Sequence, residues 1–294
     1  MLKTSIILTF VAISSVYCNV TSTCGQKEVC ISYLDTAIDM ISKAKENIPT
    51  CKNCHGNALS KAIDCADVLQ MGHNTSGVYE IWPVNRLTEG KSLYVYCDMD
   101  TNGGGWTVIQ RRGDFKREKD YFFRDWNSYK AGFGDIEKDF WLGNDNIFAL
   151  TNQKLYSARF DLKDVEQNKR YALYDKFWID DETHKYTLHI SDYSGDAGNS
   201  MDTHKNQKFS TKDQDNDKHD THCADRFKGG WWYNACHRVN LNGLYHKGKH
   251  ESHADGVNWH AWKGHQESLE WTEIKIRPKN FRPPSPSSSD VTPV

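Results

Sequence analysis

The sequence predicts an α+β protein, in which a sheet-centred and loop-rich domain follows a short helical segment. From about Asp64 onward, aromatic and β-branched runs alternate with Gly, Asn and Asp turns, and few long amphipathic helical patterns appear. Residues 29–48, in contrast, repeat apolar side chains at helical spacing. With 294 residues, the chain has room for one large domain and an appendage.

Residues 1–18 have the features of a secretory signal peptide. Lys3 supplies a positive charge, and Ser5 to Val16 is mostly apolar. That run is about a dozen residues long, too short to span a bilayer. We therefore expect cleavage after Cys18 and a secreted, extracellular mature chain.

Secretion decides how the cysteines are interpreted, because an oxidising compartment favours disulfides over free thiols. Eight cysteines would remain after that cleavage: Cys24, Cys30, Cys51, Cys54, Cys65, Cys97, Cys223 and Cys236. Eight cysteines allow 105 pairings, so their number alone does not pair them.

Residues 19–62 form a cysteine-flanked segment with a predicted coiled-coil helix. Its apolar seam has about two and a half heptads, which is marginal for an isolated coiled coil; it consists of Ile31, Leu34, Ile38, Ile41 and Ile48. The first four mature cysteines flank this seam, so interchain disulfides would fasten it and give a disulfide-linked homo-oligomer. The alternative is an amphipathic helix that packs on its own domain with local bridges.

Within the following domain, residues 93–97 and 106–110 are expected as strands joined by the glycine-rich stretch 102–105. Two further strands are expected at 154–162 and 183–191. Residues 280–294 are rich in proline and serine, which predicts a disordered tail.

The charge pattern narrows the range of partners. The formal net charge is −2 and both signs are interspersed, so no basic stripe is present to bind nucleic acid. Asn19 and Asn74 each begin a glycosylation tripeptide, which suits an extracellular surface.

The segment from Asp213 to Tyr245 combines alternating aspartates, two cysteines and a Gly-Gly-Trp-Trp-Tyr run. Closely spaced carboxylates and backbone carbonyls are the oxygen ligands that calcium prefers. The start of the segment resembles an EF-hand, but Lys218 replaces the turn glycine and Ala224 replaces the bidentate glutamate. The pattern predicts a loop-built calcium and ligand site of another kind.

Four motifs stand out along the chain: Cys97 to Arg112, Trp126 to Gly143, Trp231 to Gly243 and Ile274 to Pro278. They resemble the signatures of the fibrinogen-related domain, and within that family the chain is most similar to secreted lectins of the ficolin and tachylectin kind. The resemblance covers about residues 63–279 and implies a fibrinogen C-terminal-like domain. No collagen repeat, which would need glycine at every third position, is present.

The resemblance implies the bridges Cys65–Cys97 and Cys223–Cys236, the second closing a loop beside a calcium site. It also implies the Ca²⁺ ligands: side-chain oxygens from Asp215 and Asp217, and main-chain carbonyls from His219 and Thr221.

The resemblance further implies a pocket for an acetyl group. In similar lectins the peptide before the second loop cysteine is cis, which here is Ala235–Cys236, although Ala235 stands where the family usually carries Asn or Arg. His237 matches a donor to the ligand, Phe227 matches a wall position, and Trp231 to Tyr233 support the pocket from behind. Imidazoles, which titrate near neutrality, replace the usual Phe or Tyr at two further positions, His253 and His265.

The prediction is therefore a secreted calcium-binding lectin of innate immunity that recognises acetylated or related sugars on microbial or host surfaces. The alternative is a receptor- or matrix-binding protein of the angiopoietin-like or microfibril-associated kind. An enzyme is not expected, because no catalytic elbow, phosphate loop or paired-carboxylate motif is present. His250 and His253 are one residue too close for the HExxH zinc motif, which favours solvated loop histidines over a transition-metal site.

Overall fold

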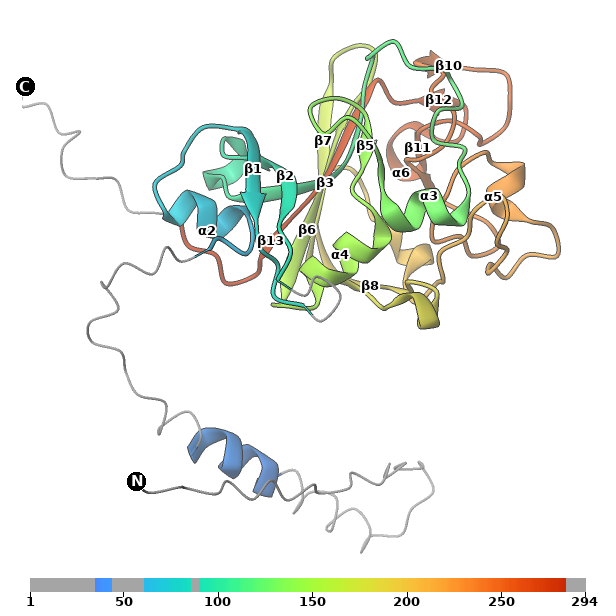
Figure 1. The fold of residues 1–294 in the computed structure, drawn as a ribbon. Coiled ribbons are helices and arrows are strands. Elements are labelled where there is room, and N and C mark those ends of the chain that lie inside the picture. Colours follow the sequence, from blue (N-terminus) through green and yellow to red (C-terminus); the bar gives the residue numbers. More distant parts are fainter. Residues whose placement is uncertain (1–34, 44–60, 86–89, 284–294) are drawn as a thin grey trace, which may run out of the picture. The chain divides into compact units, whose positions relative to one another are not determined.

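The computed structural model describes residues 35–43, 61–85 and 90–283 (Figure 1). The chain divides into two compact units, Met1–Leu59 and Ser60–Val294, which we describe separately. Among the described residues, no helix is both long and apolar enough to cross a bilayer.

In the first unit, residues 35–43 are helical and an ion pair of 2.8 Å joins Asp39 to Lys43 one turn apart. Ile38 and Ile41, both members of the predicted seam, are 60% and 62% exposed. An exposed apolar seam suits a helix that needs a partner, but the oligomer stays a prediction. Several predictions fall outside the described residues: the signal peptide, Asn19, the four flanking cysteines and the tail from residue 284.

The second unit is built on one antiparallel sheet with the spatial order β1-β2-β3-β13-β6-β7-β8 (Figure 1). These strands are β1 (Gly77–Ile81), β2 (Leu93–Asp98), β3 (Trp106–Arg112), β13 (Trp271–Pro278), β6 (Tyr156–Lys163), β7 (Lys169–Ile179) and β8 (Leu188–Gly195). Two short strands, β4 (Phe133–Gly134) and β5 (Phe140–Trp141), pair with each other, and β5 also pairs with β3. The last strand of the chain, β13, thus lies in the middle of the sheet.

Helices pack around this sheet, and some of them begin at capping side chains. The α-helices before β8 are α2 (Cys65–Gln70), α3 (Trp126–Ala131) and α4 (Asn144–Thr151), and the 3-10 helices are η1 (Thr101–Gly103), η2 (Glu182–His184) and η3 (Met201–His204). Asp64 accepts a hydrogen bond from Asp67 N at 3.0 Å at the start of α2, and Asp125 accepts one from Ser128 N at 2.8 Å at the start of α3.

The segment between β8 and β13 is mostly loop. Its short elements are α5 (Cys223–Arg226), β9 (Val239–Asn240), β10 (Gly248–Lys249), β11 (Asn258–Trp259), α6 (His260–Lys263) and β12 (Glu267–Ser268). Both disulfides implied by the resemblance are confirmed: Cys65–Cys97 joins α2 to β2, and Cys223–Cys236 closes a loop with a sequence separation of 13. The second bridge holds together a region with little regular structure.

The predicted strands at 93–97, 106–110 and 154–162 correspond to β2, β3 and β6. At the turn between the first two, Gly104 has a φ of 72°, and a Cβ there would lie 2.4 Å from the Met99 carbonyl oxygen, so glycine is required. The strand predicted at 183–191 is wrong in its first half. The Asp181 side chain accepts from His184 N at 3.1 Å and starts η2, so pairing begins only at Leu188.

A dense aromatic core lies beneath the loops. Trp231, Trp232 and Tyr233 are at most 1% exposed. The Trp232 indole donates to the Tyr186 carbonyl at 2.7 Å, and the Tyr233 hydroxyl donates to Asn240 Oδ1 at 2.6 Å. Burial of these three large aromatic side chains, two of which also have hydrogen-bonded polar groups, gives the loops a rigid floor.

Candidate functional site

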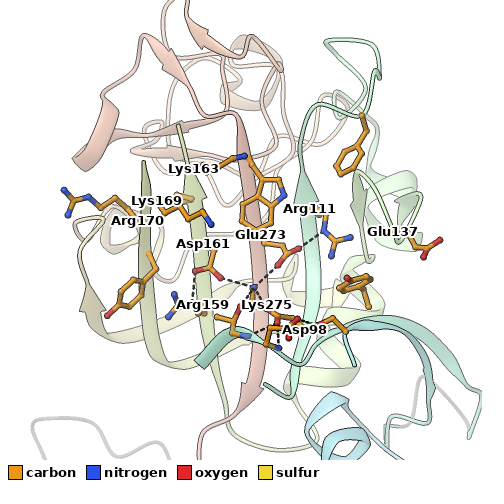
Figure 2. Close-up of a pocket in the computed structure, with 18 residues that line it drawn as sticks. Asp98, Arg111, Glu137, Arg159, Asp161, Lys163, Lys169, Arg170, Glu273 and Lys275 are labelled. Carbon is orange, nitrogen blue, oxygen red and sulfur yellow. Dashed lines mark hydrogen bonds and ion pairs between the residues drawn. The ribbon is translucent and has the colours of Figure 1, made fainter. Parts of the chain in front are cut away.

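One candidate site is a charged groove of about 630 Å³ on the face of the sheet (Figure 2). Lys275 of β13 lies at its centre with 2% of its side chain exposed. Its ammonium lies 2.5 Å from Asp98, 2.9 Å from Asp161 and 2.7 Å from Glu273.

The charges of this groove largely neutralise one another. Burial opposes the ionisation of Asp98, but the attraction of Lys275 outweighs it and lowers the pKa of Asp98 to about 2. The other two carboxylates also have arginine partners, because Arg111 and Arg159 reach them at 2.6 and 2.7 Å. We interpret the groove as a structural network that joins the middle strands.

A second candidate site lies in the loops, where aromatic and imidazole rings surround His237. Phe227 meets the His237 ring edge-on with centroids 4.6 Å apart, and Tyr233 lies 5.7 Å away. His265 lies 5.3 Å from His237, and His253 lies 5.5 Å from His265. The structure thus brings together side chains that the sequence separates by up to 38 positions.

His237 differs from the charged side chains of the groove, because its ring nitrogens have no hydrogen-bond partner among the described residues. Both ring nitrogens are buried, and neither has a hydrogen-bond partner among the described residues. Leaving a buried polar atom without a partner costs about 1–3 kcal/mol, which a ligand would recover by hydrogen bonding.

The electrostatics of this cluster favour uncharged imidazoles at two of its positions. Burial, followed by the neighbouring His204 and His265, lowers the pKa of His237 well below its usual value. Burial and then His260 lower the pKa of His265 to about 4. Both shifts favour the neutral imidazole at His237 and His265.

The aspartate loop lies directly before the Cys223–Cys236 bridge. Asp217 accepts from His219 N at 2.8 Å and from Cys223 N at 2.9 Å, while Asp215 accepts from Asp217 N at 3.2 Å. Burial and then the negative charge of Asp215 raise the pKa of Asp217. A nearby cation would relieve this repulsion. Thr221 lies exposed at the end of the same loop.

Asp213, the first aspartate of the pattern, has a different role. Its carboxylate accepts from Trp126 N at 2.8 Å and from the Thr211 hydroxyl at 2.7 Å, so it fixes the start of α3. The structure thus separates one member of the repeating pattern from the pair that resembles a calcium site.

Two further predicted site positions are the Ala235–Cys236 peptide, beside the disulfide, and Asn74, on the surface. The Ala235–Cys236 peptide bond is cis, with Ala235 exposed beside the disulfide. Asn74 lies exposed in the loop before β1, where a glycan has access. Its modification stays a prediction.

Two neighbours of the ring cluster were not predicted from the sequence. Ala254 is 1% exposed, has a φ of 63° and donates its N–H to the His265 carbonyl at 3.1 Å. His260 of α6 places its ring centroid 4.5 Å from that of His265. An alanine carries no chemical signal in sequence, and His260 was one of thirteen histidines with no distinctive spacing.

The sequence matches, over residues 61–279, the family described as "Fibrinogen beta and gamma chains, C-terminal globular domain". It is 54% identical to Techylectin-5A of Tachypleus tridentatus over 267 residues, covering 90% of this chain and 89% of that protein. It is 51% identical to a Techylectin-like protein of Phoneutria nigriventer over 258 residues, covering 87% and 98%.

Among solved structures, the fibrinogen-like globe domain of human ANGPTL2 superposes with a TM-score of 0.71 at 41% identity, covering 74% of this chain and 99% of that one. The fold and the loop-built site define a fibrinogen-like globular domain. The chain belongs to the fibrinogen C-terminal domain family, and its curated relatives include proteins named as lectins.

Proposed function

We propose that this protein is a secreted, calcium-dependent lectin that recognises acetylated sugars on microbial or host surfaces in innate immunity. The observation that carries the proposal is His237, a buried and neutral imidazole inside a wall of rings, whose two nitrogens have no hydrogen-bond partner in the part of the chain that the structure describes. Because the imidazole is already neutral, it can form hydrogen bonds with an uncharged polar ligand without first losing a proton.

An acetyl group has the chemistry that this cluster would accept. Its methyl group would contact the ring of Phe227, and its carbonyl oxygen would accept from an imidazole N–H or from backbone N–H groups near the cis Ala235–Cys236 peptide. His253 and His265 give the wall a more polar surface than Phe or Tyr would. We therefore expect an acetylated sugar with further hydroxyl groups near its acetyl group.

Calcium fits the adjoining loop, because Asp215 and Asp217 supply hard carboxylate oxygens and carry uncompensated negative charge. Those two side chains, with the carbonyl groups of His219 and Thr221, would hold the ion. When bound, it would order the loop that the Cys223–Cys236 bridge connects to His237. The ion would thus support the pocket instead of gripping the sugar.

A single shallow pocket binds weakly, so assembly through the N-terminal segment would raise avidity. The exposed apolar side chains of the helix at residues 35–43 support this assembly. We propose that residues 19–62 make a disulfide-linked homo-oligomer.

The second candidate is a ligand for a protein receptor or the extracellular matrix. The imidazoles at 253 and 265 and the similarity to the ANGPTL2 globe domain favour it. The two functions differ in one measurable respect, because only a lectin binds free sugar.

Affinity chromatography on an acetylated matrix tests the proposal. We expect the protein to be retained in calcium and eluted by a chelator or by an N-acetylated sugar, but not by the matching amino sugar without its acetyl group. The variant Asp217→Asn should lose retention. Asp225→Asn is the control because that carboxylate is 60% exposed and pairs with Lys228 on the surface.

Retention that survives both the chelator and the acetylated sugar would contradict the proposal. A glycan array on which the protein binds no sugar, with calcium present, would favour the protein-binding alternative.

A further inference from the structure

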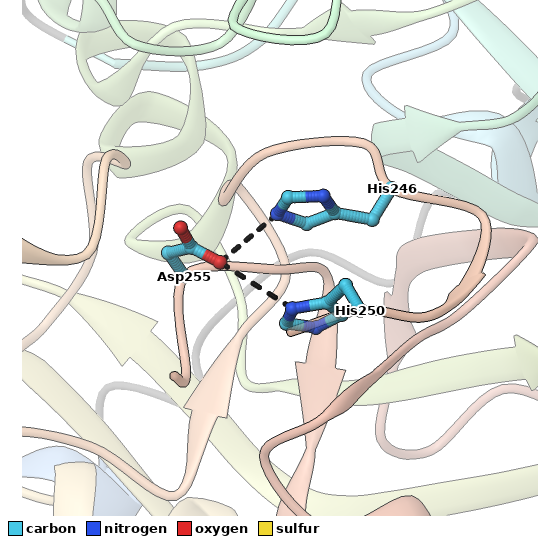
Figure 3. Close-up of side chains that lie close together, drawn as sticks. All are labelled: His246, His250 and Asp255. Carbon is cyan, nitrogen blue, oxygen red and sulfur yellow. Dashed lines mark hydrogen bonds and ion pairs between the residues drawn. The ribbon is translucent and has the colours of Figure 1, made fainter. Parts of the chain in front are cut away.

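A separate cluster of ligand atoms lies in the loop around β10, outside the proposed calcium and sugar positions (Figure 3). His246, His250 and Asp255 point toward one another there. One ligand atom from each lies within 4.8 Å of the other two. Two imidazoles and a carboxylate are a common set of protein ligands for transition metals.

The spacing of these atoms is close to that of a tetrahedral site. Asp255 Oδ1 lies 2.9 Å from His246 Nε2 and 3.6 Å from His250 Nδ1. The Ser252 hydroxyl donates to Asp255 Oδ1 at 2.7 Å and lies 3.1 Å from His250 Nδ1. It is also 3.4 Å from His246 Nε2. Ligands about 2.0–2.1 Å from a tetrahedral zinc ion stand about 3.3 Å apart, so the distances suit such an ion once an imidazole ring has reoriented.

The cluster is largely buried, and one of its two stacked rings has to turn before both can bind the same ion. The side chains of His246, His250 and Asp255 are only 8%, 5% and 16% exposed. The two imidazole rings stack with centroids 4.1 Å apart and planes 8° apart. A Cβ on Gly256 would lie 2.7 Å from His250 Nε2, so this glycine leaves the room that the ring occupies.

The charge of the cluster also suits a cation. Within the described part of the chain, the basic side chains in ion-pair range of Asp255 are these same two histidines. The other three-ligand cluster there (Asp164, Glu166 and Glu267) already surrounds the Lys263 ammonium.

We propose that His246, His250 and Asp255 bind a divalent transition-metal ion of the zinc class, with the Ser252 hydroxyl or a solvent molecule as fourth ligand. Imidazole nitrogens favour zinc, nickel and copper over calcium, so this site differs in chemistry from the aspartate loop. It differs also from a helical HExxH motif, because the short strand β10 separates the two histidines.

The metal would fix the loop that carries His253. Asp255 accepts from Leu244 N at 2.7 Å through its carbonyl group, and the neighbouring Ala254 donates to His265. A metal at this loop would therefore stabilise the wall of the ring cluster from its far side. The metal site goes beyond the proposed sugar recognition and does not depend on it.

Titration of the metal-free, full-length protein with Co²⁺ and with Zn²⁺, in constant calcium, tests the site. Cobalt in a tetrahedral nitrogen and oxygen site gives visible absorption bands, and zinc should remove them by displacing the cobalt. We expect Asp255→Asn and His250→Gln each to weaken zinc affinity at least about tenfold, since even supporting residues cost 10- to 100-fold.

His184→Gln is the matched control. His184 pairs with Asp181 at 2.8 Å but its side chain is 71% exposed and it lies in neither three-ligand cluster. The zinc affinity of the His184→Gln variant should equal that of the unaltered protein. Unaltered protein without cobalt bands, or equal zinc affinity in Asp255→Asn, would overturn the proposal. Because the bands are read on the unaltered chain, a variant that fails to fold leaves the test intact.

Discussion

Replacement of Lys275 by methionine tests whether the charged groove is a structural network. Methionine keeps most of the apolar stem of lysine but removes the ammonium that three carboxylates surround. Since the position is only 2% exposed, water cannot replace the lost charge without disturbing the sheet. We expect the fold to lose stability at neutral pH.

The size of the loss follows from the partners that remain. Asp161 and Glu273 each keep an arginine within 2.7 Å, so Asp98 bears most of the cost. The pKa of Asp98 falls from 3.8 to about 2, and at about 1.4 kcal/mol per pH unit this corresponds to about 2 kcal/mol. Breaking a buried ion pair costs about 3–5 kcal/mol, but Asp98 keeps two backbone donors at 2.9 Å. We expect a loss of about 2–3 kcal/mol.

Urea unfolding at two pH values measures this loss. A carboxylate with a lowered pKa stabilises the fold above its unfolded pKa and loses that contribution as pH falls toward the folded value. The difference between Lys275→Met and the unaltered protein should therefore shrink between pH 3.8 and about 2. The control is Lys247→Met, because that ammonium is 43% exposed in its pair with Asp114 and its loss should change little. A difference that stays constant with pH, or one no larger than the control, would refute the reasoning.

Four further outcomes concern the loop site. His237→Leu removes two unpartnered nitrogens, so sugar affinity measured by calorimetry should fall at least about tenfold while the melting temperature holds or rises. Asp217→Asn should weaken calcium binding at least about tenfold in the same assay, while Asp225→Asn should not. Because His265 has a pKa of about 4, sugar affinity in saturating calcium should be level from about pH 8 to about pH 5, and a midpoint near 6 would contradict this. Stability should decline as pH falls from 6.5 toward 4, since only the unfolded chain then gains the proton on this ring.

The sequence predicted the strands that carry their own local signal. β2 and β3 are short alternating runs around a glycine turn, and they were placed within two residues. The prediction at 183–191 failed in its first half because Asp181 caps a 3-10 turn there, and a single capping contact has no periodicity. The central position of β13 was also hidden, since it depends on pairing with β3 and β6 far away in sequence.

The site was predicted in parts for a similar reason. The Cys223–Cys236 disulfide and the aspartate pair lie in one contiguous segment that matches a family motif, so their positions were accessible from the sequence. The carboxylate that completes the histidine cluster was not, because Asp255 meets His246 and His250 only when the loop folds back. The lowered pKa of His265 likewise depends on burial, which a sequence does not state.

The two ends of the sheet domain meet at Gly105, where the backbone of Ala66 and the ring of Phe281 both lie about 3.2 Å from the position of a Cβ. Figure 1 shows α2 at one end of this domain and α5, beside the ring cluster, at the other. The first and last parts of the domain therefore lie together at one end, and α5 lies at the other end. A longer chain or a shared tether attached at this end would therefore leave the opposite end, with the proposed sugar pocket, open to a partner.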